Sequence, residues 1–127
     1  MSSYEIRVDG GIAEIDFVEV PDLGDLERAL DEIERHPGFT LGMPLILHAT
    51  AKGWNPTTGR IHHLADVLGS RREVFGGRVA AVAPTPLYHG LTRMLAAWAE
   101  PKGVIIEPFP NAAEARAWLA SFENGEG

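Results

Sequence analysis

Apolar and polar residues alternate near the start of the chain with the period of two that is typical of a β-strand. Tyr4, Ile6 and Val8 alternate with charged residues, and a second alternating run passes through Ile15. An Asp-Gly-Gly sequence at 9–11 separates the two runs, and glycine accepts the positive φ angles of a tight turn. The pattern predicts an antiparallel hairpin.

After residue 21 the spacing of apolar positions changes to that of helices alternating with buried strands. Four segments repeat apolar residues every three or four positions, which predicts amphipathic helices. These segments are 23–35, 57–75, 86–100 and 112–122. Three apolar runs lie between them and predict strands, of which the first two are typical of strands buried on both faces and the last is short. These runs are 44–49, 78–83 and 104–106.

The helical stripes identify the side chains that we expect to face the core. In the third helix they are Leu87, Leu91, Met94, Leu95 and Trp98. In the last helix they are Ala115, Trp118, Leu119 and Phe122. The helix starts carry capping signals, because Thr85 precedes a proline and Asn111 stands three residues before Glu114.

The predicted order ββαβαβαβα indicates an α/β fold with a mixed, mostly parallel sheet. The chain has 127 residues, of which 45% are apolar and 23% charged, as is ordinary for one globular domain. We therefore expect a single domain over 1–127, with its core at about 4–122 and a frayed tail at 123–127.

Composition excludes several classes of site. The chain has no cysteine, which rules out disulfides, thiolate metal sites and a cysteine nucleophile. The net charge of −7 argues against nucleic-acid binding. The N-terminus lacks the apolar stretch of a secretory signal, and no apolar run approaches the roughly 20 residues of a membrane span. We expect a cytoplasmic protein that has no cofactor, metal or membrane span.

Several stretches of the chain resemble one family. They are His-Pro-Gly-Phe at 36–39, Gly-Met-Pro at 42–44, Trp-Asn-Pro at 54–56 and Phe-Gly-Gly-Arg-Val-Ala-Ala-Val at 75–82. Two further stretches are Tyr-His-Gly-Leu-Thr-Arg-Met at 88–94 and Glu-Ala-Arg-Ala-Trp-Leu at 114–119. Together they resemble the SpoIIAA-like proteins of the STAS-like group, small bacterial domains mostly of unknown role. The resemblance covers about residues 4–122 and implies a STAS-like fold without implying an activity.

The wider STAS-like group includes antagonists of anti-sigma factors, which bind a kinase and are switched by phosphorylation. Their phosphorylated Ser or Thr follows an Asp after the third strand. Here the Asp-x-Ser-Gly pattern is absent, and His48 stands roughly where the Asp is expected. Thr50, Thr57 and Thr58 are therefore phospho-acceptor candidates by position alone.

The carboxyl ends of parallel strands are where open α/β sheets bind ligands. The predicted topology brings five candidates for ligand or partner binding to this edge of the sheet. They are His48, Trp54, Thr85, Tyr88 and His89. The residues at this edge also have purely structural interpretations: Thr57 and Thr85 as helix N-caps, His48 bonded to a neighbouring carbonyl group, Trp54 as a plug over the core, and Tyr88 and His89 as packing residues.

These observations leave three functions open. The first is a non-enzymatic STAS-like interaction or regulatory module that binds a partner protein or its own copy. The second is a domain that binds a small apolar, lipid-like or anionic ligand at the carboxyl ends of the strands, as the shared architecture with CRAL-TRIO lipid-binding domains implies. The third is an enzyme with His48 or His89 as base, although the chain lacks a nucleophile elbow, a phosphate loop and a dinucleotide motif.

Overall fold

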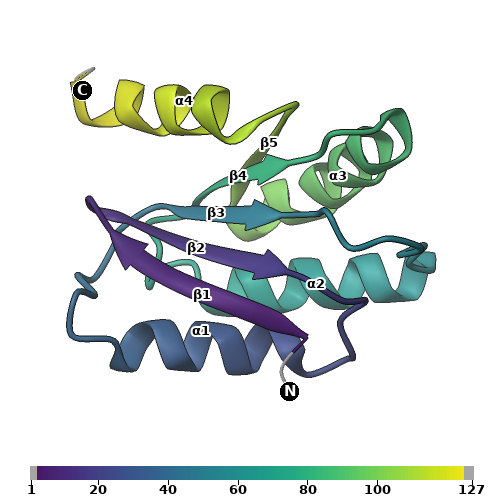
Figure 1. Ribbon diagram of the computed structural model, residues 1–127, viewed down its shortest axis with the longest axis horizontal. Coiled ribbons are helices and arrows are strands. Elements are labelled where there is room, and N and C mark those ends of the chain that lie inside the picture. Colours follow the sequence, from purple (N-terminus) through teal and green to yellow (C-terminus); the bar gives the residue numbers. More distant parts are fainter. Residues whose placement is uncertain (1–2, 125–127) are drawn as a thin grey trace.

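The computed structural model describes residues 3–124 and contains one five-stranded sheet with helices on both faces (Figure 1). The strands are β1 (Tyr4–Asp9), β2 (Ile12–Phe17), β3 (Leu45–His48), β4 (Arg78–Val82) and β5 (Ile105–Phe109). The helices are α1 (Asp25–Arg35), α2 (Thr58–Ser70), α3 (Pro86–Ala99), the short 3₁₀ helix η1 (Glu100–Lys102) and α4 (Ala112–Asn124). The predicted α/β class and the order ββαβαβαβα are confirmed.

The strands lie side by side in the order in which they occur in the chain. β1 pairs antiparallel with β2, and every later pairing is parallel. Gly10 and Gly11 form the hairpin turn with φ angles of +61° and +79°, which residues with a Cβ rarely adopt. Because β2 to β5 are parallel, their carboxyl ends meet at one edge of the sheet.

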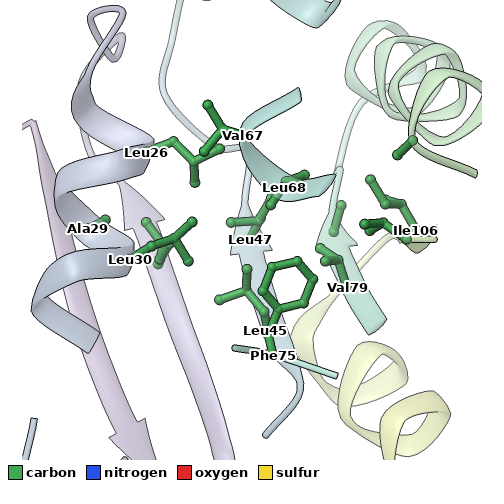
Figure 2. Packing of buried hydrophobic residues seen from close by; sticks show 14 of the residues in the cluster. Leu26, Ala29, Leu30, Leu45, Leu47, Val67, Leu68, Phe75, Val79 and Ile106 are labelled. Carbon is green, nitrogen blue, oxygen red and sulfur yellow. The ribbon is translucent and has the colours of Figure 1, made fainter. Parts of the chain in front are cut away.

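The main core lies between the sheet and helices α1, α2 and α3. Leu30 of α1, Leu68 of α2 and Leu45 of β3 are fully buried in it together with Phe75, which follows α2. Figure 2 shows these side chains converging from both layers. Strand side chains reach this core at alternate positions, as the period of two requires.

Helix α4 lies on the opposite side of the sheet from α1 and α2 (Figure 1). It packs on Ile46 of β3 and on Ala80 and Val82 of β4 through Ala115 and Leu119. β3 and β4 are therefore buried on both faces, as their apolar runs predict.

The predicted orientation of α3 is wrong for three side chains. Leu87, Met94 and Trp98 are 56%, 41% and 42% exposed. The face of α3 that meets α2 and β5 carries other residues, namely Tyr88, Thr92, Leu95 and Ala99. The apolar stripe of α3 is wider than its contact with the rest of the protein, so one side of the stripe remains in solvent.

In α4 the core prediction holds for Ala115 and Leu119 but not for Phe122, which is 37% exposed. Trp118 is half-buried and lies against Phe109, with 5.6 Å between the ring centroids. Trp118 therefore covers the margin of the smaller core instead of filling its centre.

Three predicted boundaries are also wrong. α2 ends at Ser70 and turns lead from it to β4, although Phe75 within these turns is still buried. β5 continues to Phe109, because an edge strand tolerates Pro108. α4 continues to Asn124, so the predicted frayed tail begins inside the helix, and its residues 125–127 lie outside the described residues.

Within residues 3–124, none of the helices has the length and apolar character needed to cross a membrane.

Candidate functional site

The Tyr88 hydroxyl joins three segments at the carboxyl end of the sheet. It donates a hydrogen bond to the carbonyl oxygen of Ala51 and accepts one from the Trp54 backbone N–H at 3.2 Å. Tyr88 is buried in the first turn of α3, whereas Ala51 and Trp54 belong to the loop between β3 and α2. One phenol thus fixes this loop over the main core.

A cavity of about 60 Å³ lies beneath this loop, between the sheet and helices α2 and α3. Its walls are almost wholly apolar and include Leu47, Ala81 and Leu91, with Trp54 and Tyr88 also in the lining. A dry apolar cavity of about 150 Å³ admits benzene. The present cavity is smaller, so a ligand of that size enters only if part of the lining moves.

The two hydroxyl groups of the cavity lining, those of Tyr88 and Thr92, are already engaged. The Thr92 hydroxyl donates to the Tyr88 carbonyl oxygen at 2.8 Å, within α3 itself. The ring of Trp54 lies against Phe17, with centroids 5.8 Å apart. A molecule in this cavity would therefore be held by apolar contacts rather than by hydrogen bonds.

The two predicted N-caps are formed. The Thr57 hydroxyl accepts from the Arg60 backbone N–H at 3.2 Å, and the Thr85 hydroxyl accepts from the Tyr88 backbone N–H at 3.1 Å. Both hydroxyls therefore satisfy backbone groups that the first helical turn leaves free. Of the other candidates on this edge, Thr58 and His89 are exposed on α2 and α3.

His48 does not line the cavity, because β3 directs it to the opposite face of the sheet. Leu47 points to the main core, and His48 is the next residue along an extended strand. The Thr50 hydroxyl, just beyond β3, donates to the Asp16 carboxylate at 3.4 Å. The residues predicted to share one site are therefore divided between the two faces.

On this second face, Glu14 in the middle of β2 is only 4% exposed. One of its oxygens, Oε1, lies 2.9 Å from His48 Nε2 and accepts from Arg7 at 3.2 Å. The other oxygen, Oε2, accepts from Arg116 of α4. The side chains of β1, β3 and α4 thus converge on one carboxylate of β2.

Burial raises the pKa of Glu14, but the hydrogen bonds from His48, Arg116 and Arg7 outweigh burial and hold this pKa below its ordinary value of 4.5. Glu14 is therefore ionised at neutral pH, and His48 donates from Nε2. In some enzymes a carboxylate orients the imidazole of a catalytic histidine in the same way. In the described residues, however, the only hydrogen-bond partner of the His48 ring is Glu14, and no hydroxyl nucleophile is bonded to it.

Neither Glu14 nor Arg116 is a predicted site residue. Glu14 occupies a polar position of an alternating strand, which ordinarily faces solvent. Arg116 lies 102 residues away in the chain. One feature of the sequence could have indicated this site. The strand that contains Glu14 lies beside β3, which is apolar on both faces, so the Glu14 carboxylate is expected to be covered as well. A covered carboxylate needs a cationic partner.

A third feature is the exposed apolar side of α3, formed by Leu87, Leu91, Met94 and Trp98 and called the α3 face below. The side chains of Leu87, Met94 and Trp98 are largely exposed, and Leu91 is partly buried. The Trp98 ring is held by His62 of α2, at 3.8 Å between ring centroids. The α3 face is therefore apolar, contiguous along the helix and partly fixed in place.

Within the part of the chain that the structure describes, no three His, Asp or Glu side chains are arranged to hold a metal ion. Comparison with models of protein families, with curated proteins and with solved structures finds no match to the chain. The resemblance to the SpoIIAA-like proteins therefore stays a prediction, and the function must be argued from the three features above.

Proposed function

We propose that the chain is a protein-interaction module of STAS-like type and that the α3 face is its docking surface. The observation that carries this proposal is the exposure of Leu87, Met94 and Trp98 along one side of one helix. Contiguous apolar patches on a protein surface often mark interaction sites. Single exposed apolar residues, such as Leu41 at 70% exposure, need no such explanation.

The composition of the α3 face supports docking of a protein. Trp is among the residue types most enriched in binding hot spots, and Trp98 already lies against His62 in the free chain, with the two rings tilted by 44°. An anchor that is fixed before binding loses less conformational entropy when a partner arrives. A helical partner with an apolar stripe of its own would bury all four side chains in one groove.

A photo-crosslinking amino acid at position 87 tests this proposal in the cells that make the protein. We expect a discrete crosslinked product of higher mass, because Leu87 lies at the end of the α3 face. The same amino acid at position 41 is the matched control, since Leu41 is an equally apolar and more exposed residue in the loop between α1 and β3. The product should also disappear when Trp98 is changed to Glu. Equal labelling from both positions would refute a dedicated docking surface on α3.

We propose, as a second candidate, that the cavity beneath Trp54 binds a small apolar or lipid-like molecule. The observation that favours it is an unfilled apolar space at the carboxyl ends of the strands, capped by a loop that one hydroxyl holds. Because the space is small, entry of a ligand requires Trp54 and its loop to move outward.

Calorimetric titration with decanoate tests the second candidate. We expect saturable binding of one molecule by the unaltered chain and loss of binding in Ala49→Phe, which places a ring in the cavity from its half-buried rim. Leu41→Phe adds a ring far from the cavity and should bind as the unaltered chain does. Absence of saturable heat from the unaltered chain at about millimolar decanoate, a concentration that would detect even weak binding, would exclude a binding site of this kind.

A further inference from the structure

The spacing of the α3 face is the same in both directions along the helix. Its residues Leu87, Leu91, Met94 and Trp98 are separated by four, three and four positions. An antiparallel copy of α3 placed across it would set Leu87 opposite Trp98 and Leu91 opposite Met94. A surface of this kind is self-complementary under a twofold axis, which is the commonest symmetry of protein dimers.

Small residues beside this stripe allow close approach of a facing helix. Gly90 and Ala97 flank Met94 on the exposed side of α3. A Cβ atom added at Gly90 would meet no atom within 4 Å, so no contact inside the chain requires glycine there. A helix interior disfavours glycine, and the positions of Gly90 and Ala97 leave depressions into which side chains of a second helix can insert.

The four residues of the stripe carry no charge, which matters for a chain with a net charge of −7. The charged residues nearest to the stripe along this segment are Arg93 of α3 and Glu100 of η1. The helical period places both of them more than a quarter turn from the stripe, toward the groove that they line with β5. The stripes of two copies therefore meet without placing like charges directly against each other.

We infer that the α3 face binds the α3 face of a second copy and forms a twofold, antiparallel helix pair. This inference rests on the proposed function, because it names the partner of that docking surface. One helix pair buries less than the about 1,200 Å² of a stable interface, so the dimer is reversible and forms at about 0.1 mM protein or above.

Sedimentation of the purified chain across protein concentrations tests the inference. We expect the weight-average mass to rise from 13.8 kDa at low concentration toward twice that value. Met94→Glu places a carboxylate at the centre of the contact and should weaken association by about tenfold or more. Leu41→Glu introduces the same charge on another exposed apolar residue and should associate as the unaltered chain does. Both variants should keep the unaltered circular dichroism spectrum, because both positions are exposed.

Two results would overturn the inference. A dimer that persists in Met94→Glu would use another surface. A chain that stays monomeric to about 1 mM would not pair through α3, because even a weak helix contact associates detectably at that concentration. Crosslinking from position 87 then separates the two proposals. A product with a different protein would leave the docking surface standing and reject only the second copy, whereas no product at all would reject both.

Discussion

Glu14 of β2 and Arg116 of α4 form an ion pair between residues that are 102 positions apart in the chain. The carboxylate is buried, whereas the Arg116 side chain is 45% exposed. The pair adds a polar contact to the smaller apolar core through which the last helix packs on the sheet. It also binds the hairpin to α4, because Arg7 of β1 shares the same carboxylate.

Glu14→Gln should destabilise the fold by roughly 1–3 kcal/mol, because the amide keeps the shape of the side chain but leaves three cationic or donor groups without their carboxylate. Urea denaturation measures this loss as a lower midpoint with an unchanged slope. Glu5→Gln is the control, since Glu5 lies on the same face of the hairpin but is exposed. Equal stabilities of the two variants would show that the network contributes nothing.

Acid should weaken the fold through the same carboxylate. Because the pKa of Glu14 is lower in the folded than in the unfolded chain, its contribution is complete above about pH 4.5 and is lost as the pH falls through the folded value. Asp25 acts in the same direction: burial raises its pKa, but hydrogen bonds from Ser3, Asp22 and Arg28 outweigh burial. The stability difference between the unaltered chain and Glu14→Gln should therefore shrink as the pH falls below 4.5. Urea midpoints that stay a constant distance apart from pH 7 to about pH 3, where a Glu is largely protonated, would contradict this.

Tyr4 should ionise only at unusually high pH. Burial and a hydrogen bond to Glu32 raise its pKa to about 12 from the ordinary 10.0. A raised pKa stabilises the fold below pH 10, and this contribution is lost as the pH rises toward 12. Titration of tyrosinate absorbance should show a step near pH 12 that is absent from Tyr4→Phe. A step that Tyr4→Phe leaves unchanged would assign the ionisation to another group.

Tyr88→Phe should loosen the loop that covers the cavity. The change removes the hydroxyl that joins Ala51 to Trp54, at a cost of about 1–2 kcal/mol. The Trp54 amide should then exchange its hydrogen faster, which nuclear magnetic resonance measures directly. Tyr4→Phe also removes a buried hydroxyl but lies outside the cavity lining, and it should leave this exchange unchanged. Slow exchange in both variants would mean that other contacts hold the loop.

Gly90→Ala should stabilise the isolated chain by about 0.5–1 kcal/mol, because alanine is the better helix former and its methyl group enters open space. Gly76→Ala is the contrasting variant and should destabilise the chain. Gly76 has a φ of +70°, and an added Cβ would lie 2.6 Å from the Gly42 carbonyl oxygen. The thermal midpoints of the two variants should therefore move in opposite directions.

The order of helices and strands and the capping of the helices could be read from the sequence. Thr57 and Thr85 cap α2 and α3 as their positions indicate, and the Asn111 side chain accepts from the Glu114 backbone N–H at 2.9 Å. Each of these interactions joins residues within one helical turn. Local spacing of polar and apolar residues is sufficient to specify them.

Tertiary structure alone decided which side of each element meets another. The apolar stripe of α3 is wide enough to be buried on either side, and contact with α2 and β5 determined that Leu95 is buried and Trp98 is not. In the same way, the alternating pattern of β2 predicts that Glu14 faces solvent. Glu14 is buried only because α4 packs over that face of the sheet. Such pairings join residues far apart in the chain, so they depend on how the layers pack and leave no local pattern in the sequence.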